Sequence, residues 1–221
     1  MTYQIDLVRR AEVQMLRDIC ITTFRETFEG SYSDEDFRDF FESAYSIEAL
    51  EQELNNPQSE TYFYREHGEL LGFFKINVDA GQTEAKGTEY LELQRIYFVK
   101  DAQSGGKGTR VFNFVLQRAQ ELAKTKIWLG VWKHNKQALQ FYKKHGFVKT
   151  GEHQFITGNT IDLDAVMEKE LTTNWTPSKP YINTQTVDKV SGFVGSFLCT
   201  LSAGTASACS LQRVLFPQES A

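Results

Sequence analysis

The fold is decided by residues 90–132, YLELQRIYFVKDAQSGGKGTRVFNFVLQRAQELAKTKIWLGVW. The first ten of them, 90–99, are rich in β-branched and aromatic side chains and predict a strand. A glycine-rich loop follows, and residues 110–124 then carry apolar side chains at helical spacing. Residues 127–132 are nearly all apolar, which suits a buried strand. Strand, helix and strand in this order predict one parallel β-α-β crossover.

Outside the crossover, helices come first and antiparallel strands follow. Residues 11–28, 33–45 and 46–54 place apolar side chains three and four apart, so we expect three helices at the start of the chain. The other expected elements are a hairpin of strands 61–65 and 70–78 around His67-Gly68, a helix at 135–144, and a last hairpin of strands 147–156 and 161–170 around Gly158-Asn159. Together these elements predict an α/β (α+β) domain.

The C-terminal segment differs in composition from the rest of the chain. Residues 172–221 hold three of the four prolines and only five charged residues, and no helical or strand period runs through them. We therefore expect residues 1–171 to form the domain. Residues 172–221 are expected to be a low-charge, Ser/Thr-rich tail that is poorly ordered.

Composition excludes several classes of function. The 221 residues carry a net charge of -5, which argues against a nucleic-acid-binding surface. No apolar run approaches the ~20 residues of a membrane-spanning helix. The three cysteines (Cys20, Cys199 and Cys209) and the four histidines lack the spacing of a disulfide framework or a metal site. We therefore expect a cytoplasmic protein that binds no metal, no membrane and no nucleic acid.

The loop of the crossover, KDAQSGGKG (100–108), carries the strongest chemical signal. Gly105, Gly106 and Gly108 leave backbone amides uncovered at the start of a helix, and Lys107 adds positive charge. Glycine clusters are often plain turns. A strand before the loop and a helix after it favour a phosphate site instead.

The pattern Gln103-x-x-Gly106-x-Gly108 resembles the pyrophosphate-binding signature of the GNAT superfamily of acetyl-CoA-dependent N-acetyltransferases. The resemblance covers about residues 3–171. Three further stretches resemble the family: LGVWKHN (129–135), ALQFYKKHGF (138–147) and GEHQFITGNTIDLDAVMEKEL (151–171). The segments ETFEGSYSDEDF, FFKINVDAGQTE, LELQRIYF and IWLGVW resemble more narrowly the PaiA-type branch, whose activity is polyamine N-acetylation.

The resemblance implies a fold and a donor site. The fold would be a mixed, mostly antiparallel sheet with helices on both faces, whose crossover binds acetyl-CoA as the acetyl donor. It implies that the cofactor is held by Ile96, Tyr97, Phe98, Gln103, Ser104, Gly105, Gly106, Lys107, Gly108, Thr109 and Asn135. Asn135 also suits a plain helix N-cap. Ser104, Gly105, Thr109 and Arg110 depart from the residues usual in the family.

Two residues are candidates for catalysis. Tyr142 stands where the family places a tyrosine near the cofactor sulfur, and a phenol can protonate a leaving thiolate; the alternative is an aromatic core residue. Glu92 stands on the strand that often supplies the base for the amine, and the alternative is a structural glutamate. Strand alternation predicts that Glu92, Gln94 and Ile96 share one face.

Charge supports a cationic acceptor. Residues 29–60 hold ten acidic side chains and one basic side chain, Arg38, and a negative rim would attract a cationic amine. An ordinary solvated helix face is the alternative for most of them. On resemblance, Glu84 is a further amine contact. The expected activity is acetyl transfer to a primary amine, most simply a polyamine, by direct attack in a ternary complex. Acetylation of a peptide amine, a non-catalytic acyl-CoA sensor and a homodimeric assembly stay open.

Overall fold

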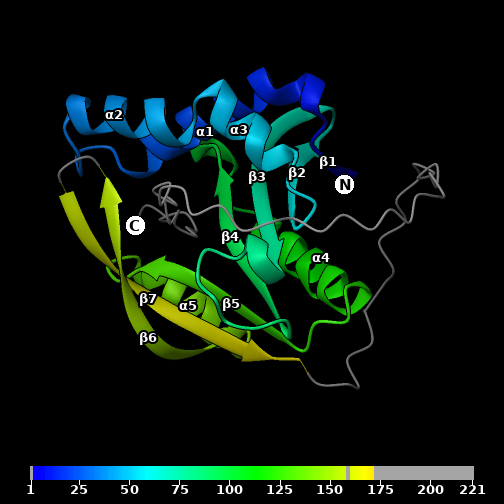
Figure 1. Ribbon diagram of the computed structural model, residues 1–221. Helices are drawn as coiled ribbons and strands as arrows, with labels where there is room; N and C mark the ends of the chain where they lie inside the picture. Colours follow the sequence, from blue (N-terminus) through cyan, green and yellow to red (C-terminus); the bar gives the residue numbers. More distant parts are fainter. Residues whose placement is uncertain (1, 158–159, 172–221) are drawn as a thin grey trace, which may run out of the picture.

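The predicted crossover lies at the centre of a seven-stranded sheet (Figure 1). The computed structural model describes residues 2–157 and 160–171, so the predicted tail lies outside the described residues. The strands, in the spatial order β1-β2-β3-β4-β5-β7-β6, are β1 (Tyr3–Leu7), β2 (Ser59–Glu66), β3 (Glu69–Val78), β4 (Tyr90–Phe98), β5 (Lys126–Trp132), β6 (Val148–Thr157) and β7 (Thr160–Glu170). Within the described chain only β4 and β5 pair in parallel, which confirms a mostly antiparallel sheet.

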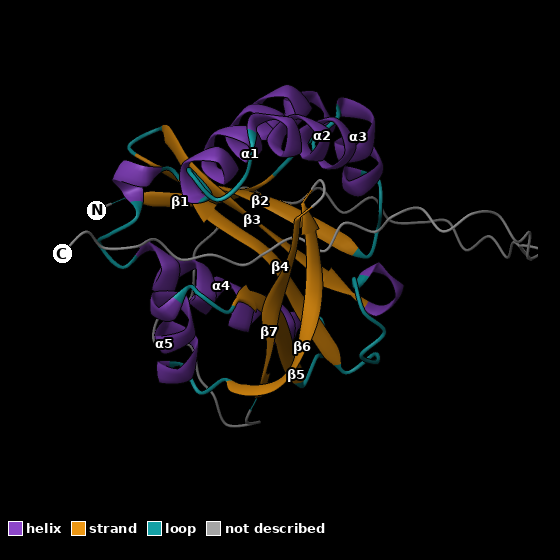
Figure 2. Ribbon diagram, turned by 90° about the vertical axis from the view of Figure 1, so that its left-hand side faces the viewer, coloured by secondary structure: helices purple, strands orange, loops and turns teal. Residues whose placement is uncertain are grey.

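The helices cover both faces of the sheet, as expected (Figure 2). They are α1 (Val13–Thr27), α2 (Asp34–Ala44), α3 (Ile47–Leu54), α4 (Lys107–Glu121) and α5 (Lys136–Lys144). The first three pack on one face around an aromatic core that includes Phe24, Phe40 and Tyr97. The last two pack on the other face, around a core that includes Val111 and Ile127. The sheet therefore lies between two hydrophobic cores, one on each face.

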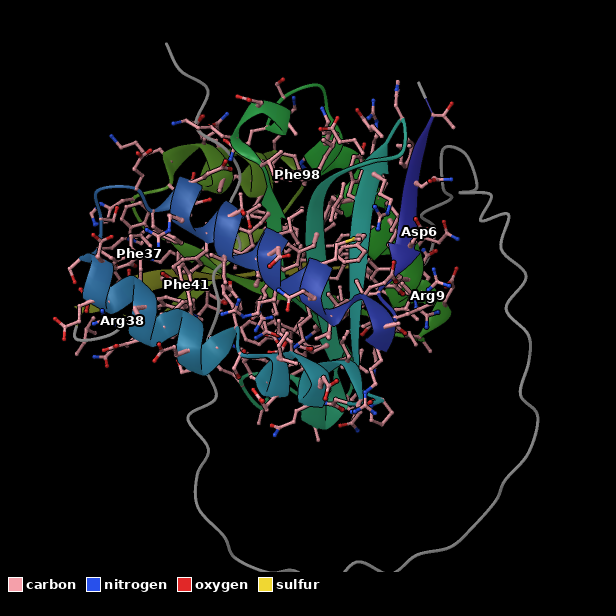
Figure 3. The ribbon with its side chains drawn as sticks, turned by 90° about the horizontal axis from the view of Figure 1, so that it is seen from above. Asp6, Arg9, Phe37, Arg38, Phe41 and Phe98 are labelled. Carbon is pink, nitrogen blue, oxygen red and sulfur yellow. The ribbon has the colours of Figure 1, made fainter. Side chains whose placement is uncertain are left out.

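Local sequence explains where the N-terminal helices begin. The Ser33 side chain accepts a hydrogen bond from the Asp36 backbone, and the Asp36 carboxylate accepts one from the Ser33 backbone, which forms a capping box for α2. Figure 3 shows Phe37 and Phe41 on the buried side of α2, while Arg38 points away from the body. Helix α2 is thus amphipathic, as its spacing predicted.

The hairpin β2–β3 forms where the sequence placed it. His67 and Gly68 both adopt positive φ angles, 53° and 84°, as a tight two-residue hairpin turn requires. Strand β1 was not predicted from the sequence. It has five residues at the edge of the sheet, too few for an alternating pattern to stand out.

A bulge interrupts β4 and corrects one prediction. Ile76 on β3 faces Leu93, and Lys75 faces Arg95, so Gln94 is the extra residue on β4. The inserted residue shifts the alternation of side chains by one position. Ile96 therefore packs in the core under α4 and α5. The prediction that Ile96 shares a face with Glu92 and Gln94 was wrong.

Strands β4 and β5 separate soon after they meet. Their pairing covers three positions and ends where Glu92 faces Trp128. Beyond that point β4 continues to Phe98 and β5 to Trp132, and the two strands no longer pair with each other. The sheet therefore opens between its two central strands, next to the glycine-rich loop.

Candidate functional site

The loop after β4 presents backbone amides at the start of α4. Gly105 and Gly106 have φ angles of 75° and 74°, and Gly106 is the N-cap of the helix. A Cβ atom at Gly106 would meet no atom within 4 Å, so the backbone there is open to approach. The Gln103 side chain donates to the Phe98 carbonyl at 3.2 Å and closes the loop onto the end of the strand. These residues fit a phosphate group, because a helix N-terminus offers unpaired N–H groups and a positive dipole end.

The positive charges predicted near this loop are already paired. Lys107 donates to the Ser104 carbonyl at 3.0 Å, and its ammonium lies 3.8 Å from the Glu66 carboxylate. Arg110 contacts the same carboxylate and donates to the Tyr64 hydroxyl at 2.8 Å. Glu66, at the end of β2, is thus a functional candidate that sequence reasoning missed, since Arg110 on α4 is 44 residues away along the chain.

Asn135 is the N-cap of α5. Its side-chain oxygen accepts from the Ala138 backbone at 2.9 Å, and the residue is buried. The cap explains why an asparagine stands at this position. A contact between Asn135 and the cofactor stays a prediction.

Tyr142 lies in the core between the sheet and α5. It is fully buried in the same cluster as Ile96 and Phe98, and its ring packs 5.4 Å from Phe141 and 5.3 Å from Phe147. Burial raises the pKa of Tyr142 well above its ordinary value of 10.0. The hydroxyl therefore stays protonated at neutral pH, which is the form a proton donor needs.

Glu92 belongs to a buried hydrogen-bonded network on the other face of the sheet. Its carboxylate accepts from the Asn77 amide at 2.8 Å, from the Thr83 backbone at 2.8 Å and from the Thr83 hydroxyl. The Asn77 amide also donates to the Gln94 side chain at 2.8 Å. Burial raises the pKa of Glu92, although the hydrogen bonds from Thr83 and Asn77 and the charge of Lys75 act in the opposite direction. A carboxylate with a raised pKa is better matched to accepting a proton near neutral pH.

The two catalytic candidates lie on opposite faces of the sheet. Glu92 shares its face with Asn77 and the α1–α3 layer, whereas Tyr142 lies in the α4–α5 core. Glu92 also marks the last paired position before β4 and β5 separate. Glu92 therefore lies at the opening itself.

The segment that joins β3 to β4 is tied down over β5 and β7. Gln82 accepts a hydrogen bond from the Trp128 indole at 2.8 Å. Lys86 lies over the same indole ring at 5.4 Å and bonds to Glu168 at 3.1 Å. These contacts hold the segment, with Thr83 in it, against Glu92.

Glu84, predicted as an amine contact, is paired with a histidine. Its carboxylate lies 2.7 Å from His153 Nδ1 on β6, and Asp164 on β7 lies 3.8 Å from His153 Nε2. Burial favours the neutral imidazole, but the bonds and charges of Asp164 and Glu84 raise the pKa of His153. Sequence reasoning missed His153 and Asp164. Counting outward from the predicted turn would have placed them opposite each other, as the strand register does.

No group of three or more His, Cys, Asp or Glu side chains within the described residues is arranged to hold a metal ion. Among the same residues, no helix combines the length and the apolar character needed to cross a membrane.

Comparison with known protein families identifies the family of this chain. The model of the acetyltransferase (GNAT) family matches residues 18–147. The chain belongs to the GNAT family. An uncharacterized N-acetyltransferase of Lactobacillus delbrueckii subsp. lactis is 34% identical over 169 residues, which cover 76% of this chain and 98% of that relative. The predicted family is confirmed, and the protein is an acetyl-CoA-dependent N-acetyltransferase.

Other similar GNAT proteins include polyamine acetyltransferases. Spermine/spermidine N(1)-acetyltransferase of Bacillus subtilis (strain 168) is 29% identical over 105 residues, or 47% of this chain and 65% of that protein. The crystal structure of PaiA N-acetyltransferase from Thermoplasma acidophilum in complex with coenzyme A superposes with a TM-score of 0.62 at 20% identity, covering 77% of this chain and 99% of that one. This similarity confirms the GNAT fold, and coenzyme A in a protein of that fold agrees with acetyl-CoA as the donor here.

Proposed function

We propose that this protein acetylates a small cationic amine, such as a polyamine, by direct attack of the amine on acetyl-CoA. The observation that carries the proposal is the position of Glu92, buried and hydrogen-bonded where β4 and β5 separate. The spermine/spermidine acetyltransferase among the relatives supports the choice of substrate class.

The donor would lie along the opening between the two strands. The loop 103–108 would hold the pyrophosphate through backbone amides, with Gly106 and Gly108 giving it access. The backbone of Ile96, Tyr97 and Phe98 would pair with the pantetheine amides, as an added strand does. Ser104, Gly105, Lys107 and Thr109 complete the predicted loop contacts, and Asn135 would contact the pantetheine from the start of α5.

Three proton transfers would accompany acetyl transfer. A free alkyl ammonium has a pKa of about 10.4, so the amine must lose a proton before it attacks. Glu92 would take that proton, directly or through a water molecule. The amine nitrogen then forms a bond to the thioester carbonyl carbon, and the carbon–sulfur bond breaks. Tyr142 would give its proton to the leaving sulfur, and the nitrogen would lose its second proton to the resulting phenolate, directly or through water, which leaves a neutral amide and restores Tyr142.

Only the exposed acidic residues of 29–60 would help to attract a cationic acceptor. Of the acidic residues in 29–60, Glu53 and Glu60 form partly buried ion pairs with arginines, whereas Asp39 and Glu42 are exposed on α2. The exposed members would attract a cation over about a Debye length, ~8 Å at physiological salt.

The test is a thiol-release assay with acetyl-CoA against spermidine, spermine, a neutral-chain monoamine and a lysine peptide. We expect the polyamines to have the highest kcat/KM, and their advantage over the monoamine to shrink as salt rises. A higher kcat/KM for the lysine peptide would instead favour a peptide acetyltransferase. Binding of acetyl-CoA without turnover of any amine would favour an acyl-CoA sensor.

A further inference from the structure

One carboxylate faces two cations in the first turn of α4. The Glu66 side chain lies 3.8 Å from the Lys107 ammonium and contacts the Arg110 guanidinium. All three side chains are largely covered, with exposed fractions of 16% for Glu66, 14% for Lys107 and 25% for Arg110. An ion pair this well covered is screened less than one on an open surface.

Neighbouring side chains keep the pairing in place. The Tyr64 hydroxyl donates to Glu66 at 2.7 Å and accepts from Arg110 at 2.8 Å. The Arg110 guanidinium also lies 5.1 Å above the Tyr3 ring. Burial favours the neutral form of Glu66, but the Tyr64 hydrogen bond and the charges of Lys107 and Arg110 outweigh it and lower its pKa. Glu66 is therefore ionised at neutral pH.

The Lys107 end of this network reaches the loop itself. Its ammonium donates to the Ser104 carbonyl at 3.0 Å and lies 3.5 Å from the position that a Cβ of Gly105 would take. A phosphate on the loop amides would thus come close to Lys107, and it would also meet the negative charge of Glu66 behind that lysine.

We propose that Glu66 is the resting counter-ion of the cofactor loop, which competes with the pyrophosphate of acetyl-CoA for Lys107 and Arg110. The inference rests on the proposed loop site. Its consequence is that Glu66 weakens the binding of coenzyme A and so speeds its release after transfer. When the product leaves, the two cations return to Glu66 instead of remaining unpaired.

The hairpin offers a matched pair of variants. Glu66→Gln removes the charge but keeps a side chain of the same size. Glu69→Gln makes the same change of net charge at the residue opposite Glu66 in the hairpin register, where the side chain is exposed. Within the described chain Glu69 forms no ion pair with Lys107 or Arg110.

Coenzyme A affinity is measured by calorimetry at low ionic strength, where the Debye length is ~30 Å. Two unit charges ~8 Å apart in water interact by about one RT, and a pyrophosphate carries about two charges. We therefore expect Glu66→Gln to bind coenzyme A about fivefold more tightly and to release it more slowly in stopped flow, with a steeper loss of affinity as salt rises. Glu69→Gln should stay within twofold of wild type.

Unchanged or weaker affinity for coenzyme A in a folded Glu66→Gln variant would overturn the inference. Glu66→Ala repeats the test with a side chain that cannot form a hydrogen bond to Lys107 or Arg110. Gly106→Val separates this result from the loop assignment. If that variant loses coenzyme A while Glu66→Gln behaves as wild type, the loop site stands and the counter-ion role does not. If Gly106→Val binds normally, the loop assignment itself is wrong.

Discussion

The amide of Asn77 on β3 bridges two side chains of β4, donating to Glu92 at 2.8 Å and to Gln94 at 2.8 Å. Asn77 and Glu92 face each other in the strand register. Both acceptors turn to the same side because they stand two residues apart on β4, before the bulge at Gln94 shifts the alternation for the residues that follow. Asn77 thus holds a carboxylate and a carboxamide together at the point where the sheet opens.

Glu92→Gln should lower kcat/KM by about 10²- to 10⁴-fold, the range typical of a lost general base. Because burial raises the pKa of Glu92, the acidic limb of the wild-type pH profile should lie above the ordinary glutamate value of 4.5, with activity rising as the carboxylate ionises. This limb should disappear in the variant. Steady-state rates across pH measure both effects, with the exposed Glu89→Gln as the control. If the acidic limb of the pH profile is unchanged in Glu92→Gln, the limb reports the ionisation of another group.

Tyr142→Phe should keep acetyl-CoA affinity and lower turnover, because the ring still fills its place beside Phe147 while the proton donor is gone. General acid assistance is typically worth about 10²- to 10⁴-fold in rate. Tyr62→Phe removes a hydroxyl from another buried tyrosine of the same core cluster and should leave kcat within twofold. Equal kcat values for the two variants would show that Tyr142 serves packing alone.

Gly106→Val should abolish coenzyme A binding without unfolding the domain. A branched side chain at a φ of 74° strains the backbone and covers the amides that would meet the phosphate. Gly30→Val places the same side chain at a φ of 77° in the connection between α1 and α2, where a Cβ also has open space. Calorimetry with coenzyme A should find binding lost in the first variant and kept in the second.

Glu53→Gln should destabilise the protein strongly. The Glu53 carboxylate from α3 forms a bidentate pair with Arg95, at 2.8 and 2.6 Å, and lies 3.1 Å from Lys75. Burial opposes ionisation, but the charges and hydrogen bonds of Arg95 and Lys75 prevail and lower the pKa of Glu53 to about 2. Removing one partner of a buried pair typically costs about 3–5 kcal/mol.

The pH dependence of that loss has a definite sign. A carboxyl whose pKa is depressed on folding stabilises the native state above its unfolded pKa, 4.5, and the contribution fades as pH falls toward about 2. Urea unfolding at pH 7 and pH 3 should therefore differ more for wild type than for Glu53→Gln. Glu51 lies on the same helix as Glu53 and forms an exposed ion pair with Arg10. Glu51→Gln, which breaks this pair, should cost under about 1 kcal/mol. Equal losses for the two variants would contradict the prediction.

The sequence alone was sufficient wherever the deciding signal is local. Ser33 and Ser46 cap α2 and α3 because a side-chain oxygen meets a backbone amide three residues ahead. His67-Gly68 sets the first hairpin because few residue pairs accept two positive φ angles. The loop Gln103 to Gly108 between a strand and a helix was enough, with the matching stretches after it, to predict the family and the donor.

The tertiary structure alone decided contacts between residues far apart in the chain. Periodicity assigns faces by counting, so one inserted residue at Gln94 moved Ile96 to the opposite core without leaving any sign in the composition of the strand. The pairing of Glu66 with Lys107, and of Glu53 with Arg95, depends on how strands and helices come together in space. A charged residue looks the same in the sequence whether it faces solvent or a buried partner, because its environment is created by the packing of distant elements.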